Sequence, residues 1–244
     1  MSNRALITGI GNLYGMPGSN LPPLNADMDL SKISEMLRIK NWDSVDHIDD
    51  NELSILDTTN NTITIGKTLL PSKENILNTI NDILTIDPAT SNLLYYFTGH
   101  GLKVGGLFMI TYDEDYFNDM DMVHPPTSLL SDDSYINTIN ELLEKYEKLK
   151  VITVIDCCFS GCMIDSAKQA NKFLDRHIIF CAVNAQLAAR SPDKAASFFT
   201  ENFCKAVIES STYLELQNKI TSISGSIVPS VLLPNSFNNI VHPL

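Results

Sequence analysis

Two apolar runs that end in reactive side chains constrain this chain most. Leu93–Phe97 runs into Thr98–Gly101, a segment that contains a histidine between two glycines, and Val151–Ile155 runs into Asp156–Gly161, which contains two cysteines. Short β-branched and aromatic runs bounded by glycine are typical of buried strands. In an open parallel α/β sheet the ligand crevice lies beyond the carboxyl ends of the strands. We therefore expect two neighbouring strands to present these side chains at one edge of a sheet.

The side chains at the ends of the two runs suit nucleophilic catalysis. A thiol beside an imidazole is a nucleophile with its proton carrier, so His100 and Cys158 are the candidate pair. Cys157 is the rival nucleophile, because side chains alternate along a strand and only one of two neighbours can face the crevice. A helix that begins near Ser160 would favour the thiolate form of Cys158.

The rest of the chain alternates between strand and helix patterns. We expect strands over 4–10, 44–48, 62–65, 178–183 and 227–233, a hairpin over 105–110, and helices over 29–41, from Ser72, over 132–149, from Ser197 and from about Tyr213. Alternation of this kind predicts a mostly parallel sheet with helical crossovers.

Composition limits the functional classes. The 244 residues, 44% of them hydrophobic, suit one large α/β domain or two small ones. The formal charge of −12 and the lack of a basic cluster argue against nucleic-acid binding. No apolar run is long enough to span a bilayer and no signal peptide is evident, so we expect a soluble, cytoplasmic protein without membrane contact. Five cysteines without zinc-ligand spacing predict neither a disulfide framework nor a zinc site.

Several motifs occur in the order of a known protease clan. Gly99-His100-Gly101 after one strand, and Asp156-Cys157-Cys158 followed by Ser160-Gly161 after another, resemble the caspase and haemoglobinase clan of cysteine proteases, most closely metacaspases and bacterial caspase-like (peptidase C14) proteins. Ala5–Gly11, Leu24–Asp29 and Ser197–Phe203 resemble further blocks of the family. His100 and Cys158 are 58 positions apart, close to the offset of about 50 residues known for caspases.

The resemblance implies a fold and a division of the chain. The expected fold is α/β, a caspase-like three-layer sandwich in which helices flank a central, mostly parallel sheet. Residues 1–244 would form a single peptidase domain, with a part like the large caspase subunit over 1–183 and a part like the small subunit over 184–244.

The resemblance also implies roles for individual residues. Cys158, two positions after the aspartate, would be the nucleophile and His100 its proton carrier, which makes Cys157 a buried core residue. The backbone amides of Gly101 and Cys158 would form the oxyanion hole. Asp29 and Asp156 match the acidic residues that line the S1 pocket of metacaspases and accept arginine or lysine. For Asp29 the alternative is a charge at a helix N-terminus, a role for which Asp27 is equally suited.

Two departures from the family patterns bear on specificity. Metacaspases commonly have histidine after the catalytic cysteine, whereas this chain has Phe159, and the Gln-Ala-Cys signature of animal caspases is absent. The second departure argues against cleavage after aspartate.

Two polar segments carry further hypotheses. The acidic stretch 113–121 followed by Asp132 and Asp133 resembles the calcium-binding carboxylates of some metacaspases, so Ca²⁺ is a candidate activator although the chemistry itself requires no cofactor. The alternative is a solvated acidic loop. The segment 184–194, which includes Arg190 and Lys194, corresponds to a family loop beside the cleft and contains candidate self-cleavage sites; we favour an ordinary exposed loop.

The resemblance therefore implies a cysteine endopeptidase that cleaves protein or peptide substrates after Arg or Lys, in regulated cell death or defence, under control of an activating partner protein or an ion. One alternative is a catalytically silent caspase-like scaffold that binds a partner. Another is a different thiol hydrolase or transferase, because a fold and a dyad do not determine the scissile bond.

Overall fold

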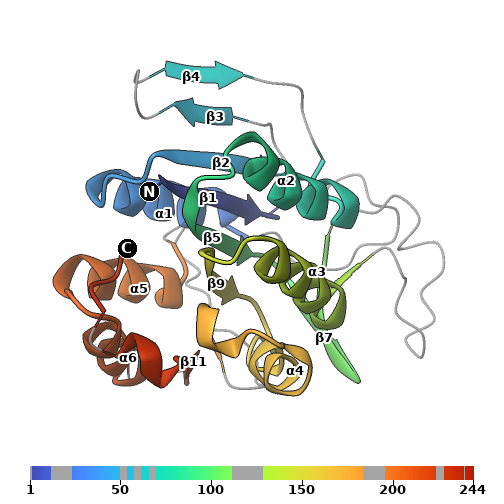
Figure 1. The fold of residues 1–244 in the computed structure, drawn as a ribbon, viewed down its shortest axis with the longest axis vertical. Helices are drawn as coiled ribbons and strands as arrows, with labels where there is room; N and C mark the ends of the chain where they lie inside the picture. Colours follow the sequence, from blue (N-terminus) through green and yellow to red (C-terminus); the bar gives the residue numbers. More distant parts are fainter. Residues whose placement is uncertain are drawn as a thin grey trace.

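The middle layer of the molecule is a sheet of eight strands (Figure 1). The computed structural model describes residues 2–11, 24–49, 70–111, 129–183, 196–223, 228–238 and 240–244, and the backbone of 54–57 and 62–65. The strands are β1 (Ser2–Gly9), β2 (Ser44–Asp49), β3 (Ser54–Asp57), β4 (Thr62–Ile65), β5 (Thr90–Thr98), β9 (Lys150–Asp156), β10 (His177–Cys181) and β11 (Ser230–Leu232).

The strands lie in the order β11-β10-β9-β5-β1-β2-β3-β4. The five strands from β10 to β2 are parallel, and β11, β3 and β4 pair antiparallel at the two edges. This confirms the predicted α/β architecture with a mostly parallel sheet.

A smaller sheet continues directly from the end of β5. It consists of β6 (Gly101–Val104), β7 (Gly106–Met109) and β8 (Leu130–Ser131), joined in that order. Gly105 connects β6 to β7 with a φ of 74°, a conformation that glycine adopts without steric penalty. The predicted hairpin is present, and it begins closer to His100 than the sequence pattern indicated.

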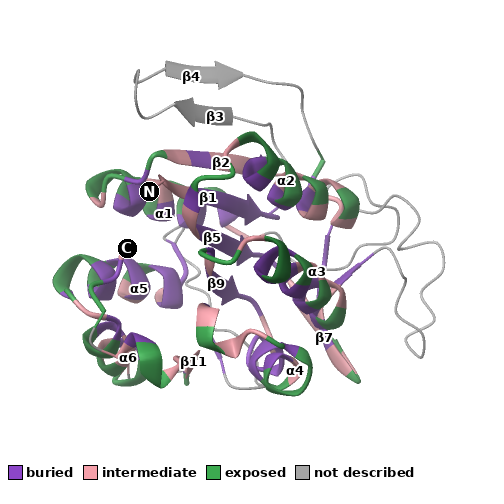
Figure 2. Ribbon diagram, in the orientation of Figure 1, coloured by how far each residue is buried: buried purple, intermediate pink, exposed green. Residues whose placement is uncertain are grey.

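Helices cover both faces of the large sheet. They are α1 (Ala26–Ile39), α2 (Lys73–Ile86), α3 (Asp132–Lys145), α4 (Cys162–Ala170), α5 (Phe198–Glu209) and α6 (Tyr213–Thr221), with 3₁₀ turns at Leu174–Arg176 and Asn235–Phe237. One hydrophobic core contains residues of α2, α3 and α4, and the other contains residues of α1, α5 and α6. Figure 2 shows the buried residues on the sheet and on the helix faces turned toward it. Among the residues that the structure describes, no helix is both long and apolar enough to cross a membrane.

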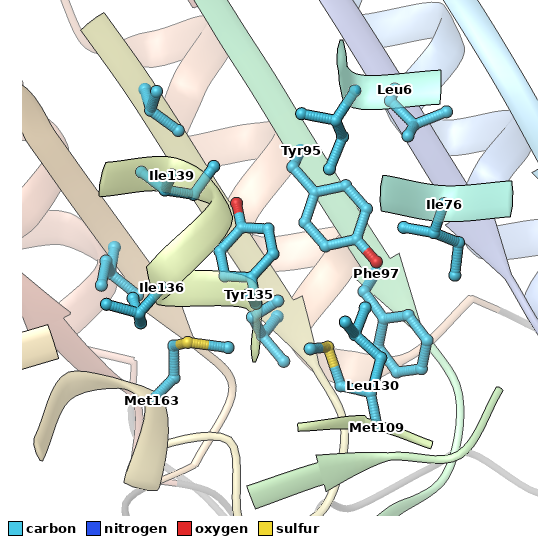
Figure 3. Close-up of a cluster of buried hydrophobic side chains, with 14 of the residues drawn as sticks. Leu6, Ile76, Tyr95, Phe97, Met109, Leu130, Tyr135, Ile136, Ile139 and Met163 are labelled. Carbon is cyan, nitrogen blue, oxygen red and sulfur yellow. The ribbon is translucent and has the colours of Figure 1, made fainter. Parts of the chain in front are cut away.

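Successive side chains of β5 point to opposite faces of the sheet and so belong alternately to the two cores. Leu93, Tyr95 and Phe97 pack with α2 and α3, whereas Leu94 and Tyr96 pack with α1 and α5. Figure 3 shows the first of these cores, where the rings of Tyr95 and Tyr135 lie 5.1 Å apart between their centroids. A strand that is apolar on both faces is what a central parallel strand requires.

A buried polar chain lies within the same core. The hydroxyls of Tyr135 and Thr153 are 2.6 Å apart, and Thr153 Oγ1 is 2.8 Å from Nε2 of His177. The other ring nitrogen of His177 lies 2.6 Å from the side-chain amide of Asn171. Burial lowers the pKa of His177 to about 3, so this histidine is neutral in the folded protein at pH 7.

Several element ends differ from the sequence prediction. The helix predicted over 132–149 ends at Lys145, because a turn in which Leu149 N–H donates to Tyr146 O brings Leu149 into the core. The helix expected near Ser160 begins at Cys162, and the last strand covers only 230–232. Strand β3 was not predicted, because its sequence Ser-Ile-Leu-Asp does not alternate between polar and apolar residues as that of β4 does.

Candidate active site

The register of β5 and β9 brings the two sequence motifs together. These neighbouring parallel strands pair Thr98 with Asp156 at their carboxyl ends, and Gly99 N–H donates to the carbonyl oxygen of Asp156 at 3.3 Å. His100 and Cys158 each follow two positions after that last pair. Both therefore leave the sheet at the same edge, from adjacent strands.

The chain turns sharply after Cys158. Phe159 has a φ of 61°, in the left-handed region that large side chains rarely adopt. Cys162 N–H donates to Phe159 O at 3.0 Å, and the Ser160 hydroxyl oxygen accepts from Val183 N–H at 3.2 Å, which attaches the turn to the end of β10. Unusual backbone conformations held by surrounding hydrogen bonds cluster at functional sites. This conformation could not be predicted from the sequence, because the residue that adopts it is not glycine.

The cysteines differ in their surroundings. Cys157 is fully buried, as predicted, whereas Cys158 is partly exposed. Burial raises the pKa of the thiols of Cys162, Cys181 and Cys204, so these groups are poor nucleophiles at neutral pH. Cys158 is thus the accessible thiol among the five.

The hairpin that follows His100 lies directly against the cysteine turn. A Cβ atom added to Gly101 would lie 2.8 Å from Cys157 Sγ and 3.2 Å from the carbonyl carbon of Cys158, with the carbonyl oxygen of Cys158 closer still. His100 O accepts from Ile110 N–H at 3.0 Å, which fixes the root of the hairpin. Glycine at position 101 is therefore required for the close approach of these two segments.

The two predicted S1 carboxylates lie on either side of one serine. Asp156 is 1% exposed and accepts hydrogen bonds from the hydroxyls of Ser197 and Thr200, the latter at 2.8 Å. Asp29 is fully buried and accepts from Thr98 Oγ1 and from Ser197 N–H, both at 2.6 Å. Ser197 thus donates to both carboxylates, one through its hydroxyl and the other through its backbone.

Ser197 also starts a helix. Its hydroxyl oxygen accepts from Thr200 N–H at 2.9 Å, which makes it the N-cap of α5. The sequence pattern indicated this helix start but not the link to Asp156 and Asp29. That link depends on contacts between residues 41 and 168 positions apart.

The candidate metal residues have different environments. Asp132 is 2% exposed, and its carboxylate accepts from Leu107 N–H, Asp133 N–H and the Ser166 hydroxyl at 2.9, 2.9 and 2.7 Å. Asp133 is exposed. Ca²⁺ takes six to eight oxygen ligands, and the described ranges contain no group of three or more His, Cys, Asp or Glu side chains arranged around a metal position. The described residues alone therefore do not make a calcium site.

Two further predictions concern residues that the structure does not describe. The acidic stretch 113–121, and the segment 184–194 with Arg190 and Lys194, lie outside the described residues. The proposed division of the domain between 183 and 184 stays a prediction.

Comparison with known proteins decides the family. The family model described as the caspase domain matches residues 2–227. The chain belongs to the caspase-domain family of cysteine peptidases. Among solved structures, the fold is similar to that of caspase-1 from Spodoptera frugiperda, with a TM-score of 0.62 and 13% sequence identity over 94% of this chain and 86% of the caspase-1 chain. A search of curated proteins finds no match.

These comparisons confirm the resemblance to caspase-like proteins and the caspase-like three-layer fold. At 13% identity the structural similarity bears on the fold alone. Family membership supports the coarse assignment to the cysteine peptidases, which act on protein substrates. The finer assignments depend on the site itself.

Proposed function

We propose that this caspase-domain protein is a cysteine endopeptidase that uses Cys158 as nucleophile and His100 as proton carrier. The observation that carries the proposal is the β5–β9 register, which places both residues at the same sheet edge. Both side chains are partly exposed, whereas Asp156 and Cys157 beside them are buried. An accessible thiol and imidazole above a buried framework are what nucleophilic catalysis on a peptide requires.

The proposed reaction has two stages. The thiol proton of Cys158 passes to His100, and Sγ attacks the carbonyl carbon of the scissile peptide bond while the backbone amides of Gly101 and Cys158 stabilise the oxyanion. The C–N bond then breaks, and the protonated His100 gives its proton to the leaving amine, which leaves a thioester on Cys158. A water molecule, deprotonated by His100, attacks the thioester, and proton return to Sγ releases the carboxylic acid product.

We assign the selection of a basic P1 residue to Asp29 and Asp156. Within the described residues Oδ1 of Asp156 receives no hydrogen bond, so this oxygen is the one left for a substrate cation. Ser197 donates to Asp29 through its backbone N–H and to Asp156 through its hydroxyl, and these two hydrogen bonds keep the carboxylates close to each other. Paired carboxylates favour arginine or lysine, because a buried cation needs anionic partners.

The dyad is tested by cleavage of fluorogenic peptides that end in Arg, Lys or Asp. Cys158→Ala and His100→Ala should abolish cleavage, and Cys157→Ala, which removes the neighbouring buried thiol, should retain it. Full activity in Cys158→Ala, or loss only in Cys157→Ala, would refute the dyad. Absence of wild-type cleavage together with no selective labelling of Cys158 by a thiol probe would favour the binding scaffold. Cleavage of esters but not of peptides would favour another thiol hydrolase.

Specificity is tested with Asp156→Asn. This change removes the negative charge but preserves the shape of the side chain, so it should lower kcat/KM on Arg and Lys peptides at least tenfold. Equal activity of the wild type on Arg and Asp peptides would contradict the proposed S1 role.

Calcium activation is a separate proposal. Asp133, with its exposed carboxylate, and the acidic stretch 113–121 are the residues that would supply oxygen ligands. Activity in CaCl₂ and in EDTA, for wild type and Asp133→Asn, tests the proposal. Equal activity of the wild type in both solutions would exclude calcium as an activator.

The cellular role is proposed at the level of the family only. We propose a metacaspase-type enzyme that acts in the cytoplasm, in regulated cell death or defence, under control of an activating partner protein. The support is the acidic pair at positions 29 and 156 together with the caspase domain. We expect the tagged protein to stay in the soluble cell fraction. We also expect peptide cleavage to rise when an extract of the source cells is added.

A further inference from the structure

One buried carboxylate connects the two segments on which the proposed dyad depends. Asp132, the first residue of α3, accepts from the backbone of Leu107 on β7 and from the hydroxyl of Ser166 on α4. The third donor is the N–H of its own neighbour, Asp133. Because an ionised carboxylate is an acceptor only, it can receive all three bonds at once.

The bond to Leu107 acts on the histidine side. Leu107 belongs to the strand that pairs with β6, the strand that begins directly after His100, and this pairing joins Gly101 to Met109. The backbone beside Leu107 is pressed against the carboxylate: a Cβ atom on Gly106 would lie 2.8 Å from Oδ1 and 3.1 Å from Oδ2 of Asp132. The position of the carboxylate therefore fixes the position of the hairpin.

The bond to Ser166 acts on the cysteine side. Ser166 lies in the second turn of α4, and α4 is the helix into which the Cys158 turn leads. Figure 3 shows Met109 of β7, Leu130 of β8 and Met163 of α4 in one apolar cluster beside Tyr135. Apolar contacts of this kind are adaptable, because methionine fills irregular space. The charge-assisted hydrogen bonds of Asp132 supply the directional part of the contact.

We propose that Asp132 is a positioning residue for the dyad: its carboxylate sets the distance between the His100 hairpin and the helix that follows Cys158. The inference rests on the proposed function, because it assumes that His100 and Cys158 act together. It assigns Asp132 a role that needs no metal ion. We call the hydrogen bonds from Leu107 and from Ser166 to Asp132 the two arms of the contact. Loss of one arm should leave the fold intact but allow the hairpin and the helix to shift relative to each other. A shift on the order of 1 Å can cost about 100-fold in rate.

The test removes each arm separately, with EDTA in every assay to exclude calcium. Ser166→Ala deletes the arm to α4, Asp132→Asn places an amide donor near the three donors, and Gly106→Ala displaces the hairpin. Ser166→Thr, which restores a hydroxyl, is the rescue variant. Ser131→Ala is the matched control, because it removes the N-cap bond of the same helix, from Ser134 N–H at 3.1 Å, without touching the carboxylate.

Two rates are measured: alkylation of Cys158 by iodoacetamide, and kcat and KM on the Arg peptide. In Ser166→Ala and Asp132→Asn the alkylation rate and kcat should fall about tenfold, with KM changed less than twofold. Ser166→Thr and Ser131→Ala should keep wild-type rates. Thermal unfolding of each variant establishes which are folded, and Ser166→Ala decides the matter if Asp132→Asn does not fold.

Contrary outcomes separate the two proposals. Wild-type rates in Ser166→Ala, or an equal loss in Ser131→Ala, would overturn the positioning role and leave the peptidase untouched. If wild-type Cys158 is alkylated in a His100-dependent manner but no peptide is cleaved, the peptidase proposal fails while the positioning role is still decided by alkylation. If His100→Ala does not change alkylation, there is no dyad and both proposals are overturned.

Discussion

Gly101→Ala tests how closely the two halves of the proposed site must approach. The new methyl group would lie 2.8 Å from Cys157 Sγ and 3.2 Å from the Cys158 carbonyl carbon, where ordinary contact begins at 3.4 Å. Neither partner can yield easily, because Cys157 is fully buried and hydrogen bonds from Cys162 N–H and Val183 N–H fix the turn after Cys158. The hairpin must therefore move away from the cysteine turn by a distance on the order of 1 Å.

A displacement of this size predicts a large effect on rate and a smaller one on stability. We expect kcat/KM on the Arg peptide, and the rate of Cys158 alkylation, to fall by about 100-fold. Overpacking should lower the free energy of unfolding by about 1–3 kcal/mol, measured by urea denaturation. Rates within twofold of the wild type would refute the reasoning, since the steric conflict would then have been absorbed without moving the site.

Gly105→Ala is the matched control for this experiment. Gly105 lies four positions along the same hairpin, and a Cβ atom there would meet nothing within 4 Å, although its φ of 74° disfavours any side chain. The change should cost about 1 kcal/mol of stability and leave both rates unchanged. An equal fall in rate for Gly105→Ala would mean that general loosening of the hairpin, and not the contact at Gly101, controls activity.

Three further predictions concern stability. Ser197→Ala removes both an N-cap and a donor to buried Asp156, so it should lower the free energy of unfolding by about 2–3 kcal/mol. The loss should exceed that in Ser131→Ala, which removes an N-cap and a donor to the neutral hydroxyl of Ser134; equal urea midpoints would contradict this. Burial lowers the pKa of His177 to about 3, so the unfolded chain binds the proton more readily than the folded protein does. The free energy of unfolding therefore falls as the pH drops below about 6.5, and the loss at pH 5 is about 2 kcal/mol. In urea titrations His177→Gln should lose about 2 kcal/mol less than the wild type between pH 7 and pH 5. Phe159→Val should be less stable than Phe159→Leu by about 1 kcal/mol in the same assay, because a β-branched residue tolerates a φ of 61° poorly; the reverse order would show that packing dominates at this position.

The sequence pattern predicted the central strands and the common sheet edge of the two motifs because those features are local. Each strand shows its own apolar run, and each reactive residue directly follows its strand. Since parallel neighbours end at the same edge, the approach of the two motifs depends on only one further condition, the adjacency of β5 and β9.

The parts that the sequence did not reveal depend on long-range contacts or on short segments. The link from Ser197 to Asp29 joins a helix start to a residue 168 positions away, and Asp132 meets Ser166 across 34 positions. No periodicity encodes such contacts. The left-handed conformation of Phe159 was hidden for another reason: the surrounding hydrogen bonds hold it there in place of the glycine that normally signals a positive φ.

The place of β9 in the sheet orders events during folding. β9 lies between β5 and β10, and β5 in turn lies between β1 and β9, so the Cys158 turn and the His100 hairpin come to one sheet edge only when strands far apart in the chain have paired. Long-range strand pairing is slow compared with helix formation. On a ribosome the histidine half emerges first, and in the proposed dyad Cys158 would have no proton carrier until β9 joins the sheet. If Cys158 and His100 form the proposed dyad, nascent and partly folded chains would lack it, and the onset of His100-dependent reactivity of the Cys158 thiol would report the pairing of β9 with β5.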